Sequence, residues 1–272
     1  MPRIDLAGKP ICITGGSSGI GAATALACAQ AGMPVVIGAR REDRLAEVAR
    51  RVQDAGGRCV FQVCDVESKE SCAALVRRTI DEFGSIYSVF ANAGYGYEQA
   101  VHEDSEDALR KIFEVNFWGS LNVIEPALPH MRAAKAGHVL WCSSCLARFV
   151  LPFYSAYSAT KAAQHHLGRA MNMELRREGI ASSTVHPVTT STEFFDTANK
   201  HSGKGVTDHT PKGFMQKPKV VANAIVRCLR SPKPEVWTSH SARIGMALCA
   251  AFPSWGEWGV RGMVRKREAA SA

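Results

Sequence analysis

Tyr157 and Lys161 stand four residues apart in a segment of helical periodicity. On a helix, this spacing places both side chains on one face. A free phenol has a pKa of about 10 and is a poor acid or base near neutral pH. An ammonium group about 4 Å away, at an effective dielectric constant of about 20, favours the phenolate by up to about 4 kcal/mol and lowers the phenol pKa by up to about three units. The pair therefore suits proton exchange near pH 7, although solvated surface pairs show the same spacing.

The elements that position this pair alternate as far as about residue 240, with apolar strand-length stretches followed by longer segments of helical period. The predicted strands are residues 10–14, 35–39, 59–63, 86–91, 138–143, 181–186 and 235–238. The predicted helices are residues 19–31, 42–55, 68–83, 105–131, 155–177 and 219–229. Strands that are apolar on both faces favour parallel pairing under two layers of helices. We therefore predict an α/β, doubly wound Rossmann sheet of about seven strands in a single domain, residues 1–240.

Two segments depart from this alternation. Residues 189–216 are rich in Thr, Ser, Gly, His and Lys, and a loop of this length is typical of a lid or substrate loop. Residues 241–272 form a C-terminal tail with an apolar run, a proline, two tryptophans and a basic end. We expect the tail to cover the substrate pocket or to contact another subunit. A membrane-surface location is the third alternative, ranked lower because the apolar run is short and broken by proline.

A glycine-rich stretch, Thr14 to Gly21, follows the first predicted strand and leads into a helix. Glycines allow a tight turn and close approach to a pyrophosphate, and the helix N-terminus favours negative charge. This position between the first strand and first helix predicts a dinucleotide-binding loop, whereas a plain turn is the simpler alternative. The predicted cofactor contacts in it are Gly15, Ser17, Ser18, Gly19, Ile20 and Gly21.

The second predicted strand ends at Arg40 and Arg41, where an NAD-specific protein usually has a carboxylate for the ribose hydroxyls. Two arginines there favour NADP(H), because they can bind a 2′-phosphate, and NAD(H) remains possible if both are merely solvated. After the third strand, Asp65 and Val66 are predicted to meet the adenine, with a helix-flanking turn as the alternative for Asp65.

Together these features resemble the short-chain dehydrogenase/reductase family over about residues 7–240. Asn92, Ala93 and Gly94 resemble the family motif after the fourth strand, and residues 187–192 resemble the stretch that receives the nicotinamide. The resemblance implies a catalytic tetrad of Asn116, Ser144, Tyr157 and Lys161. It also implies cofactor contacts at Tyr157, Lys161, Pro187, Val188, Thr190 and Thr192, with Thr189 close enough to leave the last choice open.

The resemblance implies reversible conversion of an alcohol to a ketone or aldehyde, in which Tyr157 exchanges a proton with the substrate oxygen. Ser144 would hydrogen-bond that oxygen, with Ser143 as the neighbouring alternative. Lys161 would depress the phenol pKa and bind the nicotinamide ribose, and Asn116 would hold a water on the proton path. A homodimer or homotetramer is expected by resemblance alone. A nucleotide-binding regulatory or scaffold protein without turnover is the alternative function.

The sequence departs from the family pattern at His186-Pro187-Val188, where the family usually has Pro-Gly. A branched side chain at Val188 is expected to narrow the site beside the nicotinamide. A second departure is Ala91 in place of the commoner Asn, and we expect little consequence from it.

The predicted substrate-facing residues are mostly aromatic or aliphatic, and they lie beyond the strand ends. They are Ser144, Cys145, Leu146, Tyr154, Tyr157 and Phe194. This set favours a bulky apolar alcohol or carbonyl, such as a steroid, a retinoid, a long-chain or an aromatic compound. Arg148 is the nearby charge that argues for an acidic substrate instead.

The charge and the cysteines narrow the remaining classes of protein. The formal charge is +8, but the basic residues are dispersed and do not alternate with aromatic ones, so we expect no nucleic-acid partner. Nine cysteines, mostly in apolar stretches, indicate reduced core thiols, and the absence of a signal-like or membrane-spanning run predicts a cytoplasmic protein. Cys142 and Cys145 form a CxxC pair without a second pair of ligands, so we predict no metal.

Overall fold

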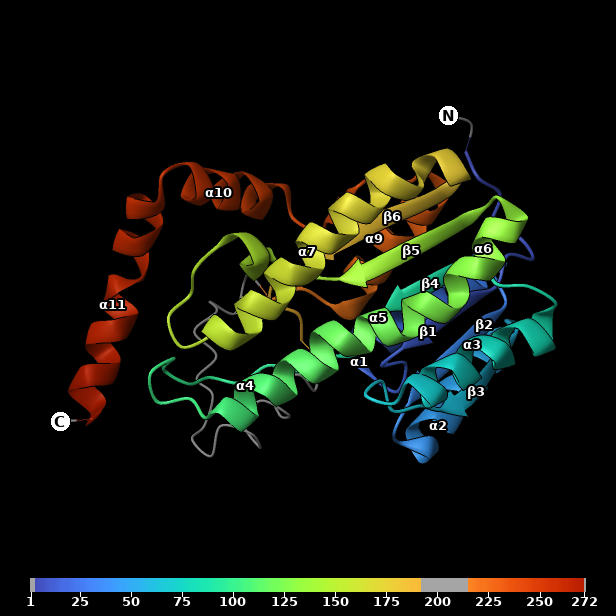
Figure 1. Cartoon of the computed structure of the whole chain (residues 1–272), viewed down its shortest axis with the longest axis horizontal. Helices are drawn as coiled ribbons and strands as arrows, with labels where there is room; N and C mark the ends of the chain where they lie inside the picture. The colour runs from blue at the N-terminus through green and yellow to red at the C-terminus, as the bar shows by residue number, and fades with distance from the viewer. Residues whose placement is uncertain (1–2, 192–214, 272) are drawn as a thin grey trace.

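The computed structural model describes residues 3–191 and 215–271, so Thr192 and Phe194 lie outside the described residues. Seven strands form one parallel sheet in the order β3-β2-β1-β4-β5-β6-β7 (Figure 1). They are β1 (Ile11–Thr14), β2 (Val35–Ala39), β3 (Cys59–Val63), β4 (Ser88–Ala91), β5 (Gly137–Cys142), β6 (Ile180–His186) and β7 (Glu235–Trp237). The predicted doubly wound fold is confirmed, and each strand lies within two residues of its predicted bounds.

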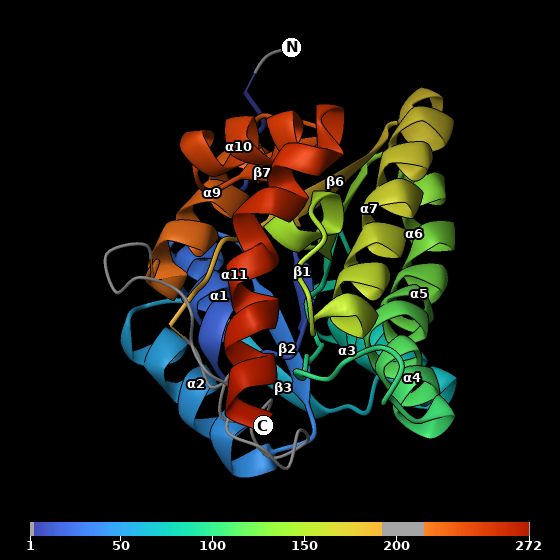
Figure 2. The same ribbon diagram turned by 90° about the vertical axis from the view of Figure 1, so that its left-hand side faces the viewer.

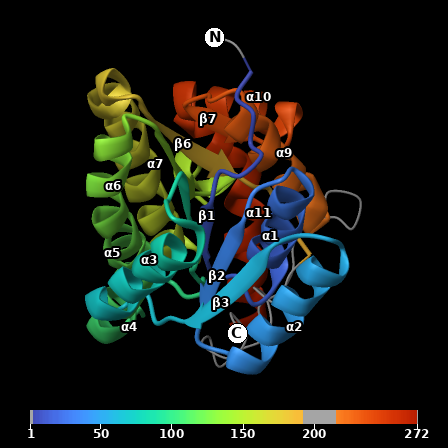
Figure 3. The ribbon, with the colours of Figure 1, turned by 90° about the vertical axis from the view of Figure 1, so that its right-hand side faces the viewer.

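Helices cover both faces of the sheet, as Figures 2 and 3 show from opposite sides. One layer contains α1 (Gly19–Gln30), α2 (Glu42–Asp54) and α9 (Pro218–Arg230), and the other contains α3 (Lys69–Phe83) and α7 (Ser155–Leu175). Alternate residues of β1 serve the two layers, since Ile11 and Ile13 join one buried cluster and Cys12 joins the other. This division explains why the central strands are apolar throughout.

The helix predicted over residues 105–131 forms without interruption over residues 106–134, but its hydrogen-bonding pattern changes along the way (Figure 1). Its successive segments are α4 (Glu106–Phe113), the π-helical turn η1 (Glu114–Trp118), α5 (Gly119–Ile124), the 3-10 turn η2 (Glu125–Ala127) and α6 (Leu128–Ala134). Pro126 and Pro129 lack an N–H group, which accounts for the change near η2. The π turn contains Asn116 and bears directly on the site.

The C-terminal tail folds as α10 (His240–Ala251) and α11 (Pro253–Ser271), and α11 lies in front of the carboxyl ends of the strands in Figure 2. Proline is tolerated in the first turn of a helix, where its missing N–H would have no partner, and α11 accordingly begins at Pro253. Gly256 is buried, and a Cβ there would lie 3.0 Å from the Phe149 ring and 3.2 Å from Cys249, so α11 packs closely at this point. Within the described part of the chain, no helix is both long and apolar enough to cross a membrane.

Candidate active site

The glycine-rich turn joins β1 to α1 and is braced by Asn92 at the end of β4. The Asn92 side chain donates to the carbonyls of Thr14 at 2.9 Å and Gly15 at 3.3 Å. Gly15 has φ +65°, and a Cβ there would lie 2.8 Å from Asn92 Nδ2. The N-cap residue of α1, Ser18, makes no capping hydrogen bond to the helix, so the first turn presents its N–H groups. The turn therefore fits the pyrophosphate of a dinucleotide.

Arg41 crosses this turn from the start of α2. Its Nη2 donates to the hydroxyls of Ser17 and Ser18, each at 3.2 Å. Arg40 and Arg41 are both exposed at the end of β2, where no carboxylate occupies the last strand position. Two cations thus stand next to the phosphate-binding turn, in the region expected for the adenosine ribose.

The other predicted cofactor residues are held by backbone hydrogen bonds. Asp65 Oδ1 accepts from the Glu67 N–H at 3.2 Å, and Asn122 donates to the carbonyl of buried Val66 at 2.9 Å. The Ala93 N–H donates to Thr14 Oγ1 at 3.1 Å. These contacts support the turn interpretation of Asp65 and leave its contact with adenine a prediction.

The stretch after β6 is tied to the loop that carries the predicted substrate residues. The Cys145 N–H donates to the carbonyl of Pro187 at 3.1 Å, and Thr190 Oγ1 donates to that of Val188 at 2.7 Å. Thr190 also forms an isolated bridge with Gln216. Thr192 belongs to the residues outside the description, so the choice among the threonines stays a prediction.

Asn116 is fully buried in the π turn, and its side chain binds protein groups at both ends. Its Oδ1 accepts from the Tyr95 N–H at 2.9 Å, and its Nδ2 donates to the Tyr95 carbonyl at 2.8 Å and to Thr160 Oγ1 at 3.0 Å. A Cβ on Gly94 would lie 2.9 Å from Asn116 Oδ1, so only glycine fits beside it. The side chain thus fastens the segment after β4 to α7, and the expected role of Asn116 in holding a water stays a prediction.

The backbone carbonyl of Asn116 also has protein partners. It accepts from Gln164 Nε2 at 2.6 Å and from the Ser120 hydroxyl at 2.7 Å. Lys161 joins the same group of residues, because its Nζ donates to Gln164 Oε1 at 3.0 Å and to the Cys142 carbonyl at 2.7 Å. We call Lys161, Gln164, Asn116 and Ser120 the Lys161 network.

Tyr157 lies between Lys161 and Ser144. Lys161 Nζ is 5.4 Å from the centroid of the Tyr157 ring. Burial raises the pKa of Tyr157 and the Cys142 thiol adds to the rise, whereas a hydrogen bond with Ser144 lowers it. Burial also lowers the pKa of Lys161. The net pKa of Tyr157 is thus raised, with desolvation as the largest cause, and the depression of the phenol pKa by Lys161 stays a prediction.

Ser144, and not Ser143, is the serine beside Tyr157. The Ser143 hydroxyl donates to the Lys161 carbonyl at 2.8 Å and so faces α7. Ser144 caps the short 3-10 turn η3 (Cys145–Arg148), and its Oγ accepts from the Leu146 N–H at 3.1 Å. The capping role and the contact with Tyr157 coexist, because a hydroxyl can accept one hydrogen bond and donate another.

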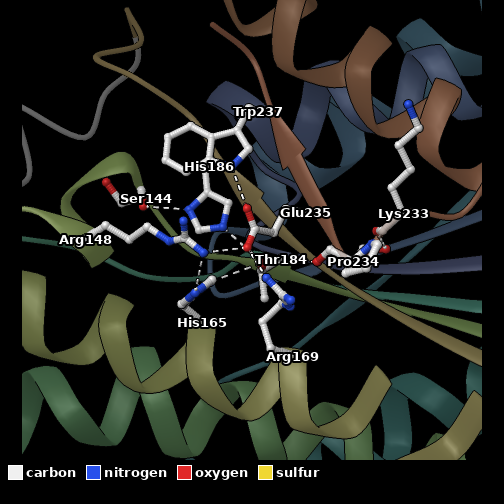
Figure 4. Close-up of polar contacts among 11 residues, drawn as sticks. Ser144, Arg148, His165, Arg169, Thr184, His186, Lys233, Pro234, Glu235 and Trp237 are labelled. Atoms are coloured by element: carbon white, nitrogen blue, oxygen red, sulfur yellow. Dashed lines mark hydrogen bonds and ion pairs between the residues drawn. The ribbon is translucent and has the colours of Figure 1, made fainter. Parts of the chain in front are cut away.

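The backbone of Ser144 is anchored by His186, which directly precedes Pro187 and Val188 (Figure 4). His186 Nδ1 lies 2.9 Å from the Ser144 carbonyl, and His186 Nε2 lies 3.0 Å from Thr184 Oγ1. The carbonyl can only accept, so Nδ1 carries the proton and Nε2 accepts from Thr184. The His186 ring stacks on Trp237 with centroids 4.5 Å apart. Burial lowers the pKa of His186 to about 4, which keeps the ring neutral.

Arg148 continues this chain of hydrogen bonds and pairs with the largely buried carboxylate of Glu235 (Figure 4). His165 contacts Thr184 Oγ1 at 3.4 Å through Nδ1 and Arg148 at 3.3 Å through Nε2. Arg148 donates to Glu235 at 2.6 Å, and Arg169 pairs with the same carboxylate oxygen. The members of this Ser144 network are Ser144, His186, Thr184, His165, Arg148, Arg169, Glu235 and Trp237.

The predicted substrate residues border this region. Cys145 is half-buried, and burial raises its thiol pKa, as it does for Cys142. All nine cysteines lie in the described residues and are free, which agrees with reduced thiols. The Tyr154 hydroxyl donates to Glu98 at 3.4 Å. In the described residues, no three His, Cys, Asp or Glu side chains gather as metal ligands would.

Sequence reasoning missed Gln164, Ser120, His165 and Glu235. A signal existed for Gln164, which lies three residues beyond Lys161 and hence on the same helix face. Glu235 gave no local signal, because it stands 87 residues from its partner Arg148. A parallel sheet with a phosphate-binding turn and an adjoining tyrosine, lysine and serine defines a Rossmann-fold oxidoreductase.

The comparisons with known proteins agree with this class. Residues 9–203 match the model of the short chain dehydrogenase family. An uncharacterized oxidoreductase of Listeria innocua is 32% identical over 228 residues, which cover 83% of this chain and 92% of the relative. The cis-4-hydroxycyclohexanecarboxylate dehydrogenase of Sinomonas cyclohexanicum is 36% identical over 214 residues, covering 78% of this chain and 86% of the relative.

A solved structure extends the comparison. The alcohol dehydrogenase of the archaeon Thermococcus sibiricus, complexed with 5-hydroxy-NADP, is 29% identical with a TM-score of 0.72, covering 84% of this chain and 95% of that one. The chain therefore belongs to the short-chain dehydrogenase/reductase family. It is an oxidoreductase that acts on the CH–OH group of donors.

Proposed function

We propose that this enzyme prefers NADP(H) over NAD(H) and interconverts a bulky apolar alcohol with its ketone or aldehyde. The position of Arg41 carries the cofactor half of the proposal. Its guanidinium lies 3.2 Å from two hydroxyls of the phosphate-binding turn, and Arg40 stands exposed next to it. A guanidinium pairs with a phosphate through two parallel hydrogen bonds, which suits a 2′-phosphate at this place.

The proposed chemistry uses Tyr157 and Ser144 on the substrate oxygen. The nicotinamide, when bound, supplies the hydride for reduction or accepts it in oxidation. In reduction, the Tyr157 phenol gives its proton to the carbonyl oxygen, and the Ser144 hydroxyl stabilises the charge that develops there. Burial raises the pKa of Tyr157, so the phenol keeps its proton at neutral pH and is ready to donate it. Lys161 is proposed to bind the ribose and to offset the charge on the phenolate that remains.

The surroundings of Arg148 support an apolar substrate. This side chain was the charge that argued for an acidic one, but it donates to Glu235 at 2.6 Å and lies 6.0 Å from the Trp237 ring centroid. A guanidinium already paired with a buried carboxylate gains little from a second anion. Leu146 and Tyr157, both half-buried, are then the aliphatic and aromatic residues of the predicted substrate-facing set that the described structure leaves partly accessible. The Sinomonas relative is named for a charged cyclic alcohol, so substrate charge is the decisive variable.

The experiment that tests both halves is a panel of ketones and alcohols assayed with NADPH and NADH on the wild type and Arg41→Ala. Loss of one guanidinium–phosphate pair costs about 1.5–3 kcal/mol, so KM for NADPH should rise at least about tenfold while KM for NADH changes little. Apolar cyclic and aromatic carbonyls should exceed cyclohexanone carboxylates in kcat/KM. An equal rise in KM for NADPH and NADH in Arg41→Ala would contradict the cofactor preference. A higher kcat/KM for the cyclohexanone carboxylates would contradict the apolar substrate.

The tail is proposed to cover the substrate pocket or to form a contact in a cytosolic homo-oligomer. Gly256 packs against Phe149, next to η3, which supports a position near the pocket. Trp255 and Trp258 are 67% and 73% exposed, which suits a subunit contact or a membrane surface. A chain that ends at Ser241 should change either KM for the carbonyl or the size measured by light scattering. Anionic liposomes that sediment the full chain but not the shortened one would favour the membrane surface instead.

A further inference from the structure

Gln164 connects the catalytic helix to the π turn, and its side chain is fully buried. The Oε1 atom faces Lys161 Nζ at 3.0 Å, and Nε2 faces the Asn116 carbonyl at 2.6 Å and the Ser120 hydroxyl at 2.7 Å. The opposite orientation of the amide would place its NH2 group against an ammonium group and its oxygen against a carbonyl. The neighbours therefore fix which end of the amide meets Lys161.

This contact determines how Lys161 uses its three donors. Within the described residues, the Cys142 carbonyl accepts one N–H at 2.7 Å and Gln164 accepts a second. The third is left for the side on which the Tyr157 ring lies, 5.4 Å from Nζ to the ring centroid. An acceptor that carries no charge orients the ammonium group without neutralising its field.

We infer that Gln164 is a positioning residue that aims the Lys161 ammonium group at Tyr157 and, because it is neutral, leaves its positive charge effective there. The amide keeps its protons throughout the reaction, so it bridges Lys161 to the π turn as a fixed support. The Asn116 carbonyl, which accepts from Gln164 Nε2 at 2.6 Å, holds the far end of that support. The inference rests on the proposed roles of Tyr157 and Lys161.

The other titratable groups that face Tyr157 stay neutral near pH 7. Burial raises the thiol pKa of Cys142 at the end of β5 and of Cys145 in η3. Tyr95, from the segment after β4, packs against the same small apolar cluster as Tyr157 and has its pKa raised to about 12, mainly by burial. Within the described part of the chain, Lys161 is then the charged neighbour whose field a pH profile would report.

Two substitutions of similar size test the inference. Gln164→Met removes the acceptor, so the ammonium group is no longer aimed at the phenol. Gln164→Glu places a negative charge beside Lys161 Nζ, where the amide oxygen now lies at 3.0 Å, so it cancels much of the Lys161 field and is expected to raise the phenol pKa by about one unit. Both variants should move the pH profile of alcohol oxidation to higher pH. Ultraviolet titration of tyrosinate in the protein alone, read against Tyr157→Phe, should show the same shift.

Ser120→Ala is the matched control, because it removes a partner of Gln164 Nε2 and leaves the contact with Lys161 in place. It should lower the thermal stability without moving the pH profile. An unshifted profile in both Gln164 variants, or an equal shift in Ser120→Ala, would overturn the inference. If one Gln164 variant fails to fold, the other decides. Full activity in Tyr157→Phe would instead refute the proposed function.

Discussion

The two buried networks that flank Tyr157 are built from different chemistry. The Lys161 network surrounds one ammonium group with carbonyls, an amide and a hydroxyl, all neutral. The Ser144 network contains a carboxylate, two guanidinium groups and two imidazoles (Figure 4). A neutral shell preserves the field of the charge inside it, whereas in the Ser144 network Glu235 partly offsets the two arginines and neutral imidazoles stand between them and Ser144. The Lys161 network thus places a positive charge near Tyr157, and the Ser144 network fixes the position of the Ser144 backbone.

The internal balance of the Ser144 network explains how it tolerates burial. Burial alone raises the pKa of Glu235, but the Trp237 indole N–H at 2.8 Å and Arg148 outweigh it, and the net pKa is lowered. Arg169 adds a second cation to the same carboxylate. The neutral rings of His165 and His186 separate these charges from Ser144, so the chain of hydrogen bonds ends on the Ser144 carbonyl through an uncharged imidazole.

The largest expected effect is that of Tyr157→Phe, because both networks converge on this phenol. The variant keeps the ring and loses the proton donor, so kcat should fall about 10²- to 10⁴-fold in both directions. Steady-state rates with NADPH and a responsive ketone measure the loss, and fluorescence titration of NADPH should show affinity within a few-fold of the wild type. Retained turnover would mean that Tyr157 is not the proton donor and that the two networks serve the fold alone.

The fold was predictable because its signals are local. Strands that are apolar on both faces indicated the parallel, doubly wound sheet, and a glycine turn between the first strand and first helix indicated the cofactor end. The π turn was not predictable, because residues 105–131 keep helical periodicity through it. The Asn116 carbonyl in this turn accepts from Gln164 Nε2, so the missed turn and the missed residue are in direct contact.

The Tyr157 pKa shows a second limit of sequence reasoning. Spacing alone gave the attraction between Lys161 and the phenol, which favours the phenolate. Burial acts in the opposite direction, and its size depends on how tightly distant segments pack around the ring. The Ser144 network was hidden for the same reason, since Arg148 and Glu235 meet only through the tertiary fold.

A smaller effect separates the networks by their response to acid. His186 is fully buried, and its pKa is lowered from the usual 6.5 to about 4 by burial. The unfolded chain binds this proton more readily than the folded one, so the stability from neutral His186 is present above pH 6.5 and is lost as the pH falls towards 4. Between pH 7 and pH 5 this loss should be about 2 kcal/mol in the free energy of unfolding.

The variant His186→Phe should isolate that contribution, because it keeps a ring to stack on Trp237 and cannot be protonated. Urea unfolding at pH 7 and pH 5 should show a difference about 2 kcal/mol smaller than in the wild type, since His165 and His138, also lowered to about 4, remain. Gln164→Met should leave the wild-type difference intact, because it alters a shell without groups that titrate in this range. An unchanged difference in His186→Phe would show that the Ser144 network relaxes around a protonated ring. The response to acid would then not distinguish the Ser144 network from the Lys161 network.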